Sequence, residues 1–142
     1  MALSTDKVRE YMMTGPDDRN SLPVKASTTI PEGAAVSIAS GLARNFNVSD
    51  TTDGFGGFAV KRADNGTGSD SDIRVEVKTR GYVKLSVAGV SGVGNVTDAV
   101  YASDNDTFTT ASTSNVQIGK VDQWIVGAWC WVYFEALAVR SI

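Results

Sequence analysis

The sequence predicts an all-β protein, a single β-sandwich or small β-barrel domain preceded by an extended N-terminal arm. Three observations carry this prediction. Residues 73–88 alternate between apolar and polar side chains, as a half-buried strand does. Clusters of Gly, Pro, Asn, Asp and Ser recur about every ten residues, which is typical of short strands joined by turns. Residues 24–60 lack the helical spacing of apolar side chains.

Size and charge narrow the class of protein further. The chain has 142 residues and a mass of 15.0 kDa, so we predict an arm at residues 1–23 and one domain at residues 24–142. Thirteen basic residues against sixteen acidic ones give a pI near 4.8, which argues against nucleic acid as a partner. The longest apolar run, near residues 125–132, is too short to span a membrane, and the N-terminus lacks the features of a signal peptide. We therefore expect no membrane partner and synthesis in a cytoplasm.

The N-terminal arm differs in composition from the rest of the chain. A short helix is expected from Thr5 through Met13, because Ser4 or Thr5 can cap it and Gly15-Pro16 stops it. Three apolar residues interrupt this polar arm: Tyr11, Met12 and Met13. They either pack back on the domain or bind a partner, since methionine side chains suit adaptable contacts.

Short strands and turns follow the arm. Strands are expected at residues 24–30, 34–38 and 58–60, with a weaker candidate at residues 42–46 and a Pro-Glu-Gly turn at residues 31–33. Residues 62–72 combine nearly every turn-forming residue type and are predicted to be a loop. Its acidic side chains could bind calcium, but their spacing does not fit an EF-hand and a solvated loop is the simpler interpretation.

Residues 73–88 are predicted to form one long half-buried strand or two strands that share one phase. Their odd positions, such as Val75 and Val83, are apolar and should face the core. Gly81 lies on that side and is expected to mark a bend rather than a turn. The even positions carry Arg74, Lys78 and Arg80. This charged face is either solvated or in contact with another protein.

The C-terminal half continues the β pattern. Strands are expected at residues 98–102, 107–110 and 116–121, with a turn at residues 103–106. A last strand, residues 124–137, places Trp129, Trp131 and Tyr133 on one face and apolar side chains such as Cys130 on the other. Both faces are therefore expected to be covered, either within the sheet or at an oligomer interface.

The residue types needed for common catalytic sites are scarce. The chain has no histidine, which removes Ser-His-Asp and Cys-His catalysis and histidine-based metal sites. Glu76 and Glu135 could in principle act as an acid–base pair, but no spacing singles them out. The glycine-rich residues 89–94 do not have the spacing of a nucleotide-binding loop. We expect no enzyme activity, no metal and no cofactor.

Several short pieces, in this order, resemble a family of small bacteriophage capsid cement or decoration proteins. The resemblance covers most of the chain from about residue 24 onward. Each piece is a strand with its turn, and together they comprise residues 31–36, 57–60, 75–77, 80–83, 98–104, 107–109 and 118–121. The residues before Leu22 and the three tryptophans depart from the family pattern.

The resemblance implies a structural virion protein that is made in the host cytoplasm. Its partners would be the major capsid protein on the outer surface of the head and further copies of itself in a homotrimer. Candidate contacts are Tyr11, Met12, Met13, Arg74, Lys78 and Arg80. An alternative is a carbohydrate-binding β-sandwich module, in which Trp124, Trp129 and Trp131 would stack on sugars.

Overall fold

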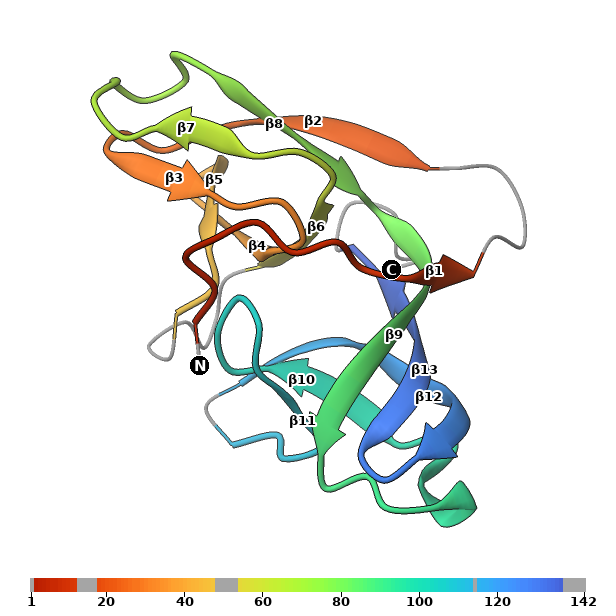
Figure 1. The fold of residues 1–142 in the computed structure, drawn as a ribbon. Helices are drawn as coiled ribbons and strands as arrows, with labels where there is room; N and C mark the ends of the chain where they lie inside the picture. Colours follow the sequence, from red (N-terminus) through yellow and green to blue (C-terminus); the bar gives the residue numbers. More distant parts are fainter. Residues whose placement is uncertain (1, 13–17, 48–53, 114, 137–142) are drawn as a thin grey trace.

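The computed structural model describes residues 2–12, 18–47, 54–113 and 115–136. It confirms the predicted all-β class. Five strands close into a β-barrel, since the first strand of the series is also hydrogen-bonded to the last. In their order around the barrel they are β9 (Arg80–Ala88), β11 (Phe108–Thr109), β10 (Ala99–Ala102), β12 (Val116–Val126) and β13 (Trp129–Glu135). The barrel occupies the lower half of Figure 1.

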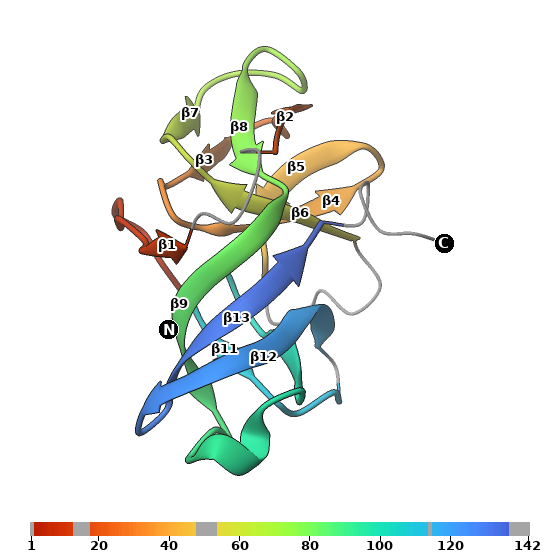
Figure 2. The same cartoon turned by 90° about the vertical axis from the view of Figure 1, so that its right-hand side faces the viewer.

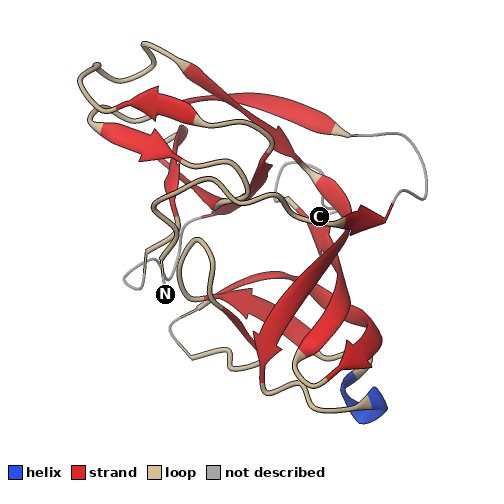
Figure 3. Ribbon diagram, viewed as in Figure 1, coloured by secondary structure: helices blue, strands red, loops and turns tan. Residues whose placement is uncertain are grey.

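A second, five-stranded sheet lies above the barrel in Figure 1. Its strands, in spatial order, are β2 (Arg19–Pro23), β8 (Arg74–Lys78), β6 (Gly54–Ala59), β4 (Ala35–Ala39) and β5 (Leu42–Asn45). An antiparallel pair of strands, β3 (Thr28–Ile30) and β7 (Ala63–Asn65), lies beside it. Figure 3 shows one helical element in the described part of the chain, the 3-10 turn η1 (Val93–Asn95). The described strands number thirteen.

The predicted long strand joins the two sheets. Its first half is β8 in the five-stranded sheet and its second half is β9 in the barrel, with Thr79 between them. Gly81 has a φ of +145°, a conformation that glycine adopts readily, so the expected bend is confirmed. Val75, Val77, Val83, Leu85 and Val87 are each at most 1% exposed, which also confirms the apolar face.

Two groups of buried side chains form the core. One fills the barrel and the other lies in the five-stranded sheet. Strand β6 contributes to both groups, since Phe58 lies in the barrel core and Ala59 in the other. Phe58 meets Phe134 of β13 edge to face, with ring centroids 5.0 Å apart. Cys130 also lies in the barrel core, where burial raises the pKa of its thiol to about 11. Its expected role as a small core residue agrees with this position.

The predicted helix at the N-terminus is wrong. Residues 2–10 are extended, and strand β1 (Tyr11–Met12) pairs with β9. The backbone forms tertiary hydrogen bonds instead of helical ones, from Lys7 N to Glu32 O and from Lys84 N to Glu10 O. A helix of nine residues is marginal in water, so these contacts decide the conformation. Residues 19–23, which were assigned to the arm, form strand β2 and pair with β8 in the five-stranded sheet.

The last predicted strand begins too early. Trp124 lies on β12, and a turn at Gly127 and Ala128 precedes β13. Gly127 has a φ of +58°, which suits a tight turn. Trp124 and Trp129 therefore lie on different strands of one hairpin.

Candidate functional site

The outer wall of the barrel carries a row of aromatic side chains. On β13, Cys130, Val132 and Phe134 point inward and are fully buried. Trp129, Trp131 and Tyr133 alternate with them and point outward. Trp129 is 42% exposed, and the other two are partly exposed. The chain itself therefore leaves the outer face of this strand partly exposed, and its coverage at an oligomer interface stays a prediction.

Neighbouring strands place polar groups beside these rings. Figure 2 shows β9, β13 and β12 side by side. Trp131 is opposite Lys84 on β9 and Gln123 on β12. Tyr133 is opposite Tyr82 on β9, and their ring centroids are 5.2 Å apart. Directly opposed residues share a face of the sheet, so this wall is an aromatic strip with polar borders.

An exposed apolar patch lies at one end of this wall. Val8, Val126 and Trp129 are 83%, 61% and 42% exposed, and we call these three residues the barrel-end patch. Val126 and Trp129 are opposed across the β12–β13 hairpin, while Val8 and Trp129 line one shallow groove. Lys84 borders the patch, with its Nζ 5.6 Å from the centroid of the Trp129 indole ring. Large exposed apolar side chains that are contiguous commonly mark interaction surfaces.

A wider groove lies at the other end of the wall. It has a volume of about 380 Å³ and is lined by Gln117, Ile118, Gly119, Lys120, Tyr133 and Glu135. We call it the Tyr133 groove. Burial raises the pKa of the Tyr133 hydroxyl above its usual value, and a hydrogen bond with Glu135 raises it further. The Tyr133 hydroxyl therefore remains protonated at neutral pH and can donate a hydrogen bond.

Two of the three predicted contact residues of the arm, Tyr11 and Met12, lie on opposite faces of the barrel wall. Tyr11 is opposite Val83 and faces the core, with its ring centroid 6.3 Å from that of Phe134. Met12 is opposite Tyr82 and so lies on the outer wall, half-buried. Met13 lies outside the described residues. Of this group, Met12 is the described residue that borders the aromatic strip.

The three predicted basic contacts also have different environments. Arg74 is exposed, and its Nε donates to Ser21 Oγ over 2.9 Å. Arg80 is exposed and forms an ion pair with Asp18. Lys78 is only 6% exposed, with its Nζ 5.1 Å from the centre of the Tyr11 ring. The expectation of one solvated basic face is thus wrong at Lys78, because β1 covers its side chain.

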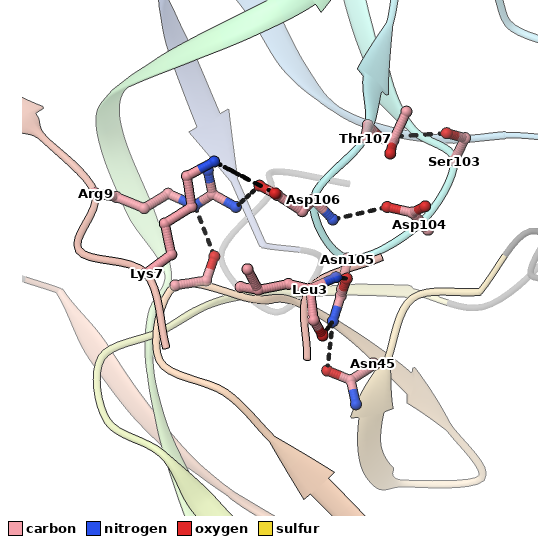
Figure 4. A network of polar contacts seen from close by, with 10 residues as sticks. Leu3, Lys7, Arg9, Asn45, Ser103, Asp104, Asn105, Asp106 and Thr107 are labelled. Atoms are coloured by element: carbon pink, nitrogen blue, oxygen red, sulfur yellow. Dashed lines mark hydrogen bonds and ion pairs between the residues drawn. The ribbon is translucent and has the colours of Figure 1, made fainter. Parts of the chain in front are cut away.

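A buried clasp ties the arm to both sheets, as Figure 4 shows. The side chain of Arg9 is 4% exposed. Its Nε donates to Gly33 O over 2.6 Å, before strand β4, and its Nη2 donates to Asp106 over 2.6 Å, in the β10–β11 loop of the barrel. The guanidinium carbon is also 5.3 and 5.4 Å from the ring centroids of Phe58 and Phe108. Sequence reasoning missed this clasp, because a single arginine in a polar arm has no pattern that points to a partner 97 positions away.

A second part of the clasp fixes the start of the arm. Leu3 N donates to Asn105 Oδ1 over 2.6 Å, and Asn105 Nδ2 donates back to Leu3 O over 3.0 Å. Asn105 Nδ2 also donates to Asn45 Oδ1 over 2.9 Å, and Figure 4 shows Asn105 between these two residues. The carbonyl of Asn105 accepts a hydrogen bond from Ala35 N. The arm, the barrel loop and the five-stranded sheet therefore meet at one buried asparagine.

The predicted loop at residues 62–72 is wrong at its start, because residues 63–65 form strand β7 and pair with β3. The acidic side chains of this segment use their oxygen atoms internally. Asp64 accepts hydrogen bonds from Gly66 N and from the Thr29 hydroxyl, which lower the pKa of its carboxyl group. Asp70 accepts from Ala26 N and Asp72 from Ser69 N. Within the described residues, no three His, Cys, Asp or Glu side chains are grouped so that they could hold a metal ion. These carboxylates order the loop.

The two glutamates considered for acid–base chemistry lie in different sheets. Glu76 is on β8 and forms an ion pair with Arg19 over 3.1 Å. Glu135 is at the end of β13 in the barrel. Each carboxylate thus has its own local partner, and neither the sequence nor the structure pairs the two.

Comparisons with known proteins were made for the whole chain. No protein-family model matches it, and searches of curated proteins and of solved structures also gave no match. Across the described ranges, no helix has the length and apolar character needed to cross a bilayer. The geometry of the two surfaces on the barrel wall is therefore the basis for the functional argument.

Proposed function

We propose that the protein is a structural virion protein that binds the outside of a bacteriophage capsid and bridges neighbouring major capsid subunits. In this role it acts as a homotrimer and carries out no catalysis. A bridging protein needs a rigid body and a docking surface, and many copies on a symmetric shell add weak contacts into firm attachment.

The observation that carries the proposal is the barrel-end patch. Val8, Val126 and Trp129 expose apolar surface on a body otherwise built from two packed sheets. Interfaces between proteins are enriched in tryptophan at their centre and in charged side chains at the rim. Lys84 and Glu10 supply such a rim, since both line the groove next to Trp129. We assign the patch to contact with a capsid subunit.

Co-sedimentation with expanded phage heads that lack the protein tests this assignment. The wild-type protein should sediment with the heads, and the double variant Val8→Ser/Trp129→Ser should bind at least tenfold more weakly because its apolar contact area is lost. Val93→Ser is the matched control, since Val93 is 73% exposed but lies on η1, outside the patch. It should bind as the wild type does.

The same assay tests the exposed arginines. Arg74→Glu/Arg80→Glu should weaken attachment without unfolding the protein, and Lys78 is left unchanged because it is buried. Sedimentation equilibrium should give a trimer for the wild type. A protein that is monomeric and remains in the supernatant with every head preparation contradicts the proposal.

A second candidate, carbohydrate binding, is favoured by a different observation. Trp129 and Trp131 lie on the same outward face of β13 and are not buried in the core. Partly exposed aromatic rings on a rigid strand are a suitable surface for sugars, which pack their C–H faces on such rings.

A further inference from the structure

We propose that the outer wall of the barrel binds a neutral oligosaccharide, with one sugar in the Tyr133 groove and the chain continuing along Trp131. This inference specifies the site and the ligand class for carbohydrate binding, and it does not depend on the capsid role. Its basis is the combination of aromatic rings, balanced charge and mixed hydrogen-bonding groups at one end of β13.

The shape and lining of the Tyr133 groove suit a sugar ring. Its volume of about 380 Å³ falls within the range of small-molecule sites. Tyr133 and Tyr82 form one aromatic cluster on the outer wall. Trp131 lies two residues before Tyr133 on β13 and on the same face. Alternate residues of a strand are roughly 7 Å apart, so Trp131 and Tyr133 offer successive stacking positions to an extended chain. A ligand longer than one sugar is therefore favoured.

The charges around the Tyr133 groove are balanced. Lys120 and Glu135 line the groove with opposite charges. Arg80 is opposite Glu135 on the neighbouring strand and is paired with Asp18. Two cations and two carboxylates thus balance around the site. A phosphate or an acidic polymer would need a basic excess, whereas a neutral ligand fits a balanced site.

The Tyr133 groove offers both hydrogen-bond donors and acceptors to a ligand. Glu135 supplies carboxylate oxygens that accept, Lys120 supplies an ammonium group that donates, and the Gln117 amide can do both. The Gln117 amide already donates to Gly119 O over 3.3 Å, and Glu135 bonds to the Tyr133 hydroxyl. A sugar hydroxyl both donates and accepts, so it can join this network without leaving a polar group unsatisfied. A purely apolar ligand could not.

The position of the groove separates it from the barrel-end patch. Tyr133 and Trp129 are four residues apart on β13, roughly 13 Å along an extended strand. Gly119 shapes the near side of the groove, because a Cβ there would lie 1.8 Å from Tyr133 O. The two strands thus approach closely beneath the groove and give it a backbone floor.

Affinity electrophoresis with neutral polysaccharides tests the proposal. The gels contain glucomannan, laminarin, xyloglucan, galactomannan or dextran, and the full-length protein should be retarded by at least one. Tyr133→Ala and Trp131→Ala should raise the dissociation constant at least tenfold, because each removes a stacking surface. Tyr133→Phe, which keeps the ring, should have a much smaller effect. Isothermal titration with an oligosaccharide of the retarding polymer then gives the constants.

Matched charge variants complete the test. Glu135→Gln should weaken binding, whereas Glu76→Gln, on the other sheet, should not. If Tyr133→Ala does not fold, Lys120→Ala and Glu135→Gln carry the comparison, since Lys120 is exposed and glutamine keeps the shape of the Glu135 side chain. Retardation by none of the polymers, retardation only by anionic heparin or alginate, or unchanged binding in the groove variants would overturn the proposal. Head binding by Tyr133→Ala is measured in parallel, so that the two proposals fail separately.

Discussion

Arg9 shows how one side chain can hold distant parts of this molecule together. It links the arm to the Gly33 turn and to the β10–β11 loop while packing over two phenylalanine rings. A buried guanidinium is stable only when its donors are paired, and here backbone and carboxylate oxygens pair them. Lys7 also pairs with Asp106, over 3.2 Å, but its side chain is 43% exposed and so contributes less.

Arg9→Ala should lower the free energy of unfolding by about 2–3 kcal/mol, because charge-assisted hydrogen bonds and packing are lost together. Urea denaturation followed by tryptophan fluorescence measures the change. The control is Arg62→Ala, whose exposed ion pair with Asp6 should be worth less than about 1 kcal/mol. Equal effects of the two substitutions would contradict the role assigned to the clasp.

At the scale of single elements, the β8–β9 strand is the part that sequence reasoning described best. Its alternation is regular because one face is buried along its whole length, first in one sheet and then in the other. The β12–β13 hairpin was described less well. Its turn at Gly127 and Ala128 lies inside an apolar run, so turn chemistry gave little signal there.

Close approach of β12 and β13 leads to a prediction at Gly119. Gly119→Ala would place a Cβ 1.8 Å from Tyr133 O and 2.9 Å from Phe134 Cα, so one strand must move. We expect destabilisation of about 2 kcal/mol or more. The control is Gly94→Ala, since a Cβ there meets nothing within 4 Å and should change stability by less than about 0.5 kcal/mol. Melting temperatures by circular dichroism compare the two, and a wild-type melting temperature for Gly119→Ala would contradict the strand geometry.

The barrel and the five-stranded sheet are connected by the continuous β8–β9 segment and by the arm. Figure 1 shows the arm crossing between them, in red. Its contacts reach Glu32 on one side and Lys84 on the other through backbone atoms. Residues 2–12 of the arm are thus packed into the fold through both sheets.

Removal of residues 2–10 should leave both sheets folded but loosen the joint between them. The amide of Glu32 donates to Asp6 Oδ1 and that of Lys84 to Glu10 O, so both should exchange with solvent faster by at least tenfold. The amide of Val87, bonded to Ala128 O at the barrel end, is the internal control and should change little. Hydrogen exchange followed by NMR measures all three. Uniform loss of protection would show instead that the barrel cannot fold without the arm.

The β class, the apolar face of the long strand and its bend at Gly81 follow from the sequence. These features depend on alternation and turn chemistry, which act between residues close together in the chain. Only the tertiary structure decided that the barrel closes, that the arm is extended, that Lys78 is buried and that Arg9 meets Asp106. It also decided which side of β13 stays open, because a strand with two apolar faces does not reveal which face its own chain covers. Closure of the barrel and coverage of a strand face depend on contacts between residues that are far apart in the sequence.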